Sequence, residues 1–334
     1  MGLFKKDKLQ VIGFQSYGTT SRLYLRGRAL EDEEIDLNQK GLFNLIRNSW
    51  KRFETDEIKH ADLIVKLTNG ESLTTTTDDH GYFLLNEKVD GLSGLINQEG
   101  WLLAEASFSN MHLHREVVHQ NRFPIEMLIP HTTSAFGVIS DIDDTILHTG
   151  VVSSLKWKLI LNTFFKSATK RRALEGTAEF YHQLHLGKSG KAANPIFYVS
   201  HSPWNLYRYL ELFLKTNNFP KGPILLRRMA SFRARKKPGE WPHKYHEIVN
   251  VLKTYPELPF ILIGDSGEKD GDIYIEVSKK FPNRIKAIYL RSVNDSKRIK
   301  RIENLFKEYT DVPFLLVNKT EEAYKHAKTH GFVQ

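Results

Sequence analysis

Three carboxylates lie within four residues in the run Asp141-Ile142-Asp143-Asp144-Thr145. Carboxylates packed this closely raise one another's pKa values unless a cation lies among them, and hard oxygen ligands suit Mg²⁺. In an extended chain Asp141 and Asp143 point to the same side. One of them can then attack a phosphorus atom while the other reaches the leaving oxygen. The alternative is a solvated acidic loop or a helix cap, but a cap does not need the apolar strand that leads into this run.

A second polar strand end follows the apolar residues 195–199, which lead to Ser200. The hydroxyl of Ser200 can donate a hydrogen bond to a phosphate oxygen. Taken alone this feature is weak, because a serine at this place can equally cap a helix over residues 204–214. Both interpretations of Ser200 therefore stay open at this point.

A third polar strand end follows residues 260–263, where Gly264-Asp265 begins a short loop that reaches Asp270. The glycine allows close approach of the backbone, and two acids on a tight loop are typical of a metal site. Upstream by about twenty residues, Lys244 can supply a fixed positive charge to a transferring phosphoryl group. A single lysine on a helix normally faces solvent, so this role for Lys244 depends on the other residues of the set.

The elements that must position these residues belong to a parallel sheet. Apolar segments over residues 137–140, 196–200, 260–263, 285–290 and 314–317 alternate with long helical patterns, including one over 177–186, and this predicts a doubly wound α/β domain. The carboxyl ends of parallel strands meet at one edge, where ligands bind in such sheets. Asp141, Ser200 and Asp265 are therefore expected in one crevice.

The chain upstream has a different pattern. Short alternating segments at residues 22–27, 61–67 and 82–85, separated by turn residues, predict an antiparallel β-sandwich over residues 1–130. One helical insertion is expected, capped by Asp36 and with Leu42, Leu45, Ile46 and Trp50 on one face. The polar segment 131–134 after Pro130 is the expected linker, so the α/β domain is assigned to residues 131–334.

Composition limits the classes of partner. The 334 residues contain no cysteine, which excludes disulfides and thiolate chemistry, and no apolar run is long enough to span a bilayer. The short N-terminal segment lacks the apolar core of a secretory signal, so a cytoplasmic location is expected. The net charge of +9 favours anionic partners such as phosphorylated substrates or anionic lipid surfaces. Nucleic acid is not expected as a partner, since no recognised binding motif accompanies the charge.

The four features together resemble the haloacid dehalogenase superfamily of phosphotransferases: an Asp-x-Asp-x-Thr loop ending at Thr145, a strand-terminal Ser200, Lys244, and an acidic Gly264-Asp265 loop. Further residues narrow the resemblance. The segments Val199-Ser-His-Ser-Pro-Trp-Asn-Leu-Tyr207, Leu262-Ile-Gly-Asp-Ser-Gly267 and Asp272-Ile-Tyr274 are similar to the catalytic domain of actin-patch-type phosphatidate phosphatases. This resemblance covers roughly residues 136–331. Looser matches at residues 27–30 and 78–83 resemble the β-domain that precedes it in many family members.

The resemblance implies a role for each residue. Asp141 would attack phosphorus to form an aspartyl-phosphate, and Asp143 would protonate the departing alkoxide and then activate water. Mg²⁺ would be bound by the Asp141 carboxylate, the Asp143 main-chain carbonyl and Asp265, with Asp270 either a direct ligand or holding a water. Ser200 and Lys244, together with Thr145 of the nucleophile loop, would bind the phosphoryl oxygens. Because an alcohol is a poor leaving group, the acid Asp143 favours a phosphomonoester substrate.

The substrate is less tightly defined by the sequence than the reaction. The segment between the first two motifs is too short for a large cap domain, which implies an open site suited to bulky substrates. Residues 155–166 interleave apolar and basic side chains, a pattern that fits a helix on an anionic membrane or simple packing on the core. Phosphatidate is the leading candidate; the alternatives are a soluble phosphomonoester and a non-catalytic binding module. The oligomeric state and the role of the β-domain are left open by the sequence.

Overall fold

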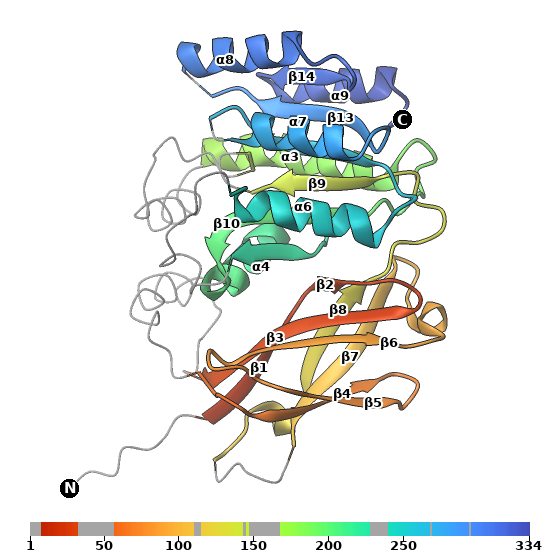
Figure 1. Ribbon diagram of the computed structural model, residues 1–334, viewed down its shortest axis with the longest axis vertical. Helices are drawn as coiled ribbons and strands as arrows, with labels where there is room; N and C mark the ends of the chain where they lie inside the picture. Colours follow the sequence, from red (N-terminus) through yellow and green to blue (C-terminus); the bar gives the residue numbers. More distant parts are fainter. Residues whose placement is uncertain are drawn as a thin grey trace, which may run out of the picture. The chain divides into compact units, whose positions relative to one another are not determined.

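The computed structural model describes residues 8–32, 57–109, 115–142, 145–146, 168–227, 240–267, 269–293 and 295–334. The chain divides into two compact units, Met1–Ile129 and Pro130–Gln334, which are drawn in Figure 1. The helical insertion expected after Asp36, the segment 155–166 and the predicted general acid Asp143 lie outside the described residues.

The first unit is a sandwich of two β-sheets. Its elements are β1 (Lys8–Phe14), β2 (Ser16–Tyr17), β3 (Arg22–Asp32), β4 (Asp62–Leu67), β5 (Ser72–Thr76), β6 (Tyr82–Lys88), η2 (Leu92–Leu95), β7 (Trp101–Phe108), η3 (His119–Asn121) and β8 (Phe123–Leu128). The sheets have the orders β1-β3-β6 and β2-β8-β7-β4-β5. Among the described strands of this unit, every neighbouring pair is antiparallel except the short pair β2 and β8.

Alternating side chains of both sheets form one apolar core, in which Leu9, Leu23, Leu63 and Leu102 are fully buried. This burial explains the alternation in the sequence, because successive side chains of a strand point to opposite faces of its sheet. The expected β-sandwich is confirmed.

The second unit is built on a six-stranded parallel sheet. Its strands are β9 (Gly137–Asp141), β10 (Ile196–Pro203), β11 (Ile224–Arg227), β12 (Phe260–Asp265), β13 (Ile285–Arg291) and β14 (Phe314–Val317), in the order β11-β10-β9-β12-β13-β14. All of β9 and β12 are buried, which accounts for their continuous apolar sequences. The sequence pattern missed β11, since this strand has only four residues and follows Pro223 directly.

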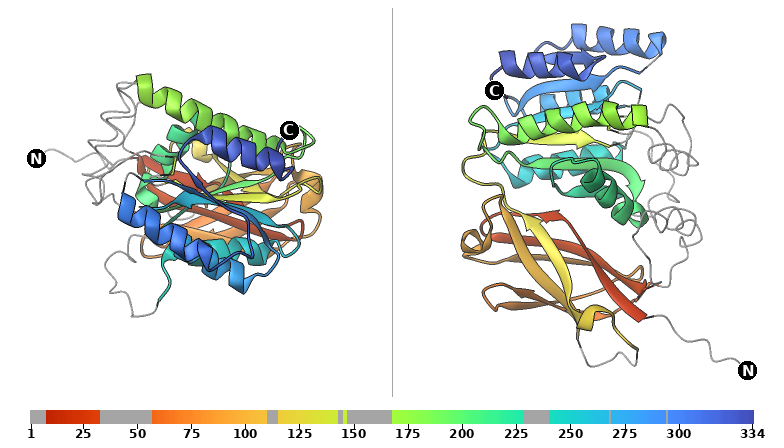
Figure 2. Two further views of the ribbon diagram at one scale, coloured as in Figure 1. Left: turned by 90° about the horizontal axis from the view of Figure 1, so that it is seen from above. Right: turned by 180° about the vertical axis from the view of Figure 1, so that it is seen from behind.

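Helices cover both faces of this sheet, as Figure 2 shows from above. They are α3 (Ala168–Leu186), η4 (Trp204–Leu206), α4 (Tyr207–Thr216), α6 (His243–Thr254), α7 (Asp270–Lys280), α8 (Ser296–Lys307) and α9 (Thr320–Thr329). Helices α3 and α9 lie on one face, and α6, α7 and α8 lie on the other. The predicted doubly wound α/β fold is confirmed. Within the described parts of the chain, no helix has the length and apolar character needed to cross a membrane.

The order of the strands defines where the site must lie. The chain enters the sheet at its centre with β9, continues outward through β10 and β11, and then returns to build β12, β13 and β14 on the other side. The connections therefore reverse direction between β9 and β12. Ligands of open α/β sheets bind outside the carboxyl ends of the strands at such a switch point.

Candidate functional site

Three buried carboxylates meet at the switch point. Asp141 ends β9, Asp265 ends β12 and Asp270 begins α7, and each is at most 1% exposed. One oxygen of each lies within 4.8 Å of the others. The register explains the meeting, because Ser140 is paired with Ile263, so that Asp141 and Asp265 end neighbouring strands almost level with one another.

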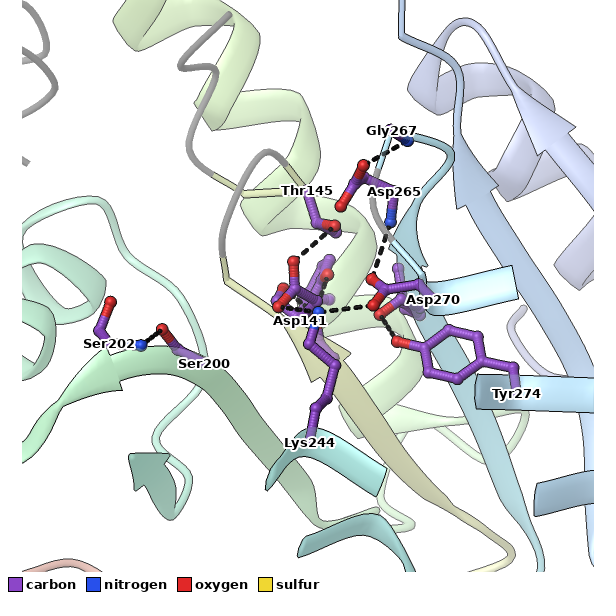
Figure 3. A network of polar contacts seen from close by, with 12 residues as sticks. Asp141, Thr145, Ser200, Ser202, Lys244, Asp265, Gly267, Asp270 and Tyr274 are labelled. Atoms are coloured by element: carbon purple, nitrogen blue, oxygen red, sulfur yellow. Dashed lines mark hydrogen bonds and ion pairs between the residues drawn. The ribbon is translucent and has the colours of Figure 1, made fainter. Parts of the chain in front are cut away.

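Lys244 lies inside this carboxylate cluster, as Figure 3 shows. Its side chain is fully buried; the Nζ atom is 2.8 Å from Asp141 Oδ1 and 2.5 Å from Asp270 Oδ1. Lys244 is the second residue of α6 and is presented from the first turn of that helix. The sequence alone left a solvent-facing lysine as the ordinary expectation, whereas the structure places this one between two acids.

Two hydroxyl groups, those of Ser140 and Tyr181, form hydrogen bonds that hold the backbone at the end of β9. Ser140 Oγ donates a hydrogen bond to the Asp141 carbonyl at 2.8 Å. Because its one hydroxyl proton is used in this bond, Ser140 Oγ accepts the second hydrogen bond, which the Tyr181 hydroxyl donates at 2.6 Å. Burial raises the pKa of Tyr181, and the Ser140 hydrogen bond only partly opposes this shift. The phenol therefore remains a donor and fixes the backbone of the proposed nucleophile.

The acidic loop after β12 is closed on itself. The Asp265 N–H donates to Asp270 Oδ2 at 3.2 Å, and the Gly267 N–H donates to Asp265 Oδ1 at 2.5 Å. The Tyr274 hydroxyl donates to the Ile263 carbonyl at 2.8 Å, and its pKa is raised well above the usual value by burial and then by the charge of Asp270. Asp270 is therefore turned back into the carboxylate cluster, despite the four residues that separate it from Asp265.

A hydrogen bond links the turn that follows β9 to β13. The Thr145 hydroxyl donates to Asp141 Oδ2 at 3.4 Å, and Arg291 Nη1 donates to the Thr145 carbonyl at 2.9 Å. Desolvation lowers the pKa of Arg291, which nevertheless remains a cation because it starts from a very high value. Arg291 thus positions the backbone of Thr145, two residues after Asp143, whose own role stays a prediction.

Ser200 lies beside Asp141 on the neighbouring strand. Val199 pairs with Asp141 in the register of β10 and β9, so Ser200 is one residue beyond the level of Asp141 (Figure 3). It is fully buried, and its Oγ accepts a hydrogen bond from the Ser202 N–H at 2.9 Å. The alternative that Ser200 caps the next helix is wrong, because η4 follows Pro203 and has no side-chain cap.

Two residues of this site were not found from the sequence: Tyr181 and Arg291. Tyr274 was part of a recognised motif, but no role was assigned to it. Tyr181 occurs within an ordinary helical pattern and Arg291 at the end of an apolar strand, so neither position carries a local signal. Their contacts arise only when α3 and β13 are packed against β9.

A doubly wound α/β domain with a buried carboxylate and lysine site at its switch point is the class of protein that this geometry defines. Residues 136–292 match the family described as "Phosphatidate phosphatase APP1, catalytic domain". Phosphatidate phosphatase APP1 of Saccharomyces cerevisiae is 33% identical over 222 residues, which are 66% of this chain and 35% of the yeast protein. This segment therefore belongs to the APP1-type family, as the resemblance predicted.

An uncharacterised protein of Schizosaccharomyces pombe is 25% identical over 219 residues, or 65% of this chain and 34% of that protein. The chain thus spans about a third of the length of these relatives. Among solved structures, a ferredoxin-NADP⁺ reductase of Plasmodium falciparum aligns with a TM-score of 0.20 and 9% identity, over 94% of this chain and 96% of that one. Such a low TM-score supports no conclusion about the fold.

Replacement of the buried lysine should destabilise the α/β unit. In Lys244→Met the carboxylates lose their ammonium partner, and breaking a buried ion pair from one side costs about 3–5 kcal/mol. Denaturant unfolding without divalent cations measures this change. Lys253→Met is the matched control, because Lys253 is an exposed residue of the same helix. Equal free energies of unfolding for the two variants would contradict the structural role of Lys244.

A methyl group at Gly264 should disturb the acidic loop. A Cβ atom at this position would overlap Asp270 Oδ2 and lie 2.8 Å from the Tyr274 hydroxyl. Gly264→Ala is therefore expected to lower the free energy of unfolding by about 1–3 kcal/mol, as overpacking usually does. Gly176→Ala serves as the control, since a Cβ there meets no atom within 4 Å in the part of the chain that the structure describes. A Gly264→Ala protein as stable as this control would show that the loop is not closely packed.

Proposed function

We propose that this chain is a Mg²⁺-dependent phosphatase that hydrolyses phosphatidate to diacylglycerol and phosphate. The observation that carries the proposal is the meeting of Asp141, Asp265 and Asp270 around Lys244 at the switch point of the sheet. The substrate is proposed from the similarity to phosphatidate phosphatase APP1 of yeast.

The donor set fits a divalent cation. Three buried carboxylates face one ammonium group, which leaves a formal excess of two negative charges among these four side chains. Hard carboxylate oxygens are the ligands that Mg²⁺ prefers. Asp141, Asp265 and Asp270 would hold the ion, with the main-chain carbonyl of Asp143 as a further proposed ligand. When bound, Mg²⁺ would neutralise charge on the phosphoryl group and orient it toward the nucleophile.

The chain's own residues supply the two steps of the reaction. Asp141 attacks phosphorus, the bond to the alcohol oxygen breaks, and Asp143 gives its proton to the departing alkoxide. Water then attacks the aspartyl-phosphate, losing a proton to Asp143, and phosphate leaves as the Asp141 carboxylate is restored. Lys244 holds the Asp141 carboxylate in place and, with Ser200 and Thr145, binds the phosphoryl oxygens.

Access to a lipid substrate requires contact with a membrane surface. The net charge of +9 supports attraction to anionic lipids from the cytoplasmic side. A soluble phosphomonoester would undergo the same chemistry, because Asp141 and Asp143 act on the phosphoryl group and its ester oxygen alone. A purely binding role is less consistent with the site, since burying three acids around one lysine is costly and a binding surface does not require it.

One assay tests the reaction and the substrate class together. Purified protein, with Mg²⁺ and with chelator, is incubated with phosphatidate micelles, lysophosphatidate and soluble phosphomonoesters, and phosphate release is measured. Mg²⁺-dependent release is expected, with phosphatidate exceeding small esters at equal phosphate. Asp141→Asn should lose at least 10³-fold in turnover, because a neutral amide cannot act as the nucleophile. Its unfolding curve checks that the fold persists, and substantial release by a folded Asp141→Asn protein would refute the mechanism.

Metal binding can be measured without turnover. A ligand that binds only the folded state at a hundred times its Kd stabilises the protein by about 2.7 kcal/mol, so Mg²⁺ should raise the melting temperature. Asp265→Asn should remove most of this increase. Asp272→Asn is the matched control, because Asp272 lies on α7 but pairs with Arg301 outside the carboxylate cluster. If Mg²⁺ still raised the melting temperature of Asp265→Asn but no longer raised that of Asp272→Asn, the metal would bind elsewhere.

A further inference from the structure

A cavity of about 320 Å³ lies beside the turn that follows Asp141. It is bounded by α3, by the carboxyl ends of β13 and β14, and by the first turns of α9. Its walls include Thr145, Gly176, Phe180, Tyr289, Val317 and Ala323. Because these residues come from the same edge of the sheet as the carboxylate cluster, the cavity and the proposed nucleophile share one edge.

The walls of the cavity combine apolar and polar side chains. Phe180, Tyr289 and Val317 are among the aromatic and aliphatic residues that line it. Thr145 and Arg291 supply polar groups near Asp141, and the segment from Asn318 to Glu321 supplies further polar groups between β14 and α9. The Thr145 hydroxyl that lines the cavity is also 3.4 Å from Asp141 Oδ2. The Thr145 side chain therefore contacts both the cavity and the Asp141 carboxylate.

Gly176 is unusual for its place in the fold. It lies inside the 19-residue helix α3, where glycine costs roughly 0.5–1 kcal/mol relative to alanine. A Cβ at this position would meet no atom of the described residues within 4 Å, so close packing against these residues does not require the glycine. The missing side chain does leave space on the wall of the cavity that Gly176 lines.

We propose that this cavity binds the apolar part of the leaving group of the phosphomonoester substrate and that Gly176 keeps it open. The inference depends on the proposed function and adds the place where an acyl chain is held. With the phosphoryl group at Asp141, the linkage oxygens of the substrate would lie near Thr145 and Arg291, and its chain would pass on between Phe180 and Val317. An inorganic anion held at Asp141 would leave the apolar walls of the cavity without a ligand.

Side chains of increasing size at Gly176 test this assignment. Gly176→Ala, Gly176→Leu and Gly176→Trp are compared by the ratio of kcat/KM for dioctanoyl phosphatidate to that for glycerol 3-phosphate, in the same detergent micelles. Leu and Trp should lower this ratio roughly tenfold or more, since filling a chain-binding pocket removes contacts with several methylene groups. Gly176→Ala should change it little while raising stability. Ala323→Leu, which fills the cavity from α9, should act like Gly176→Leu.

Controls separate failure of this inference from failure of the proposed function. Lys325→Leu adds an apolar side chain to an exposed position of α9 and should leave the ratio unchanged. If the wild type releases phosphate from both substrates but the Leu and Trp variants keep its ratio, the cavity is not the chain-binding site and the phosphatase assignment still holds. If the wild type releases no phosphate from any ester, both proposals are wrong.

Discussion

The buried ion pairs of Lys244 are the interaction on which the α/β unit depends. Three acids without exposure to water would repel one another strongly, because charges interact far more in a protein interior than in solvent. The ammonium group contacts two of the acids, and main-chain N–H groups of the acidic loop bind Asp265 and Asp270. The absence of a side chain at Gly264 lets Asp270 and the neutral phenol of Tyr274 pack closely against the end of β12. This packing also keeps Asp270 in the carboxylate cluster.

The topology of the sheet makes this arrangement available. Asp141 and Asp265 can be neighbours because β9 and β12 are adjacent, although 123 residues of sequence separate β9 from β12 at these two positions. Lys244 arrives from a third direction on α6, in the connection by which the chain returns from β11 to β12. Arg291 then links β13 to the turn after β9. The site therefore belongs to the centre of the sheet and to no single segment.

Much of the fold and of the candidate site could be predicted from local patterns in the sequence. Apolar segments that end in Asp141, Ser200 and Asp265 predict parallel strands with a common polar edge, and the structure has them. The burial of Lys244 could not be predicted, since a lysine in the first turn of a helix has the same local sequence whether it faces water or acids. The hydrogen bond from Tyr181 to Ser140 likewise depends on how α3 packs. Asp143 and the segment 155–166 lie outside the described residues, so their predicted roles remain predictions.

The joining of distant segments also has a consequence for the order of folding. Contacts between residues far apart in sequence form late, because the chain must first lose the entropy of closing long loops. Pairing of β9 with β12 brings Asp141 and Asp265 together, and Lys244 on α6 offsets part of the repulsion between the buried acids. The complete site therefore exists only in a chain whose sheet has formed and whose α6 is packed against it, so formation of the site accompanies the last long-range contacts of the domain.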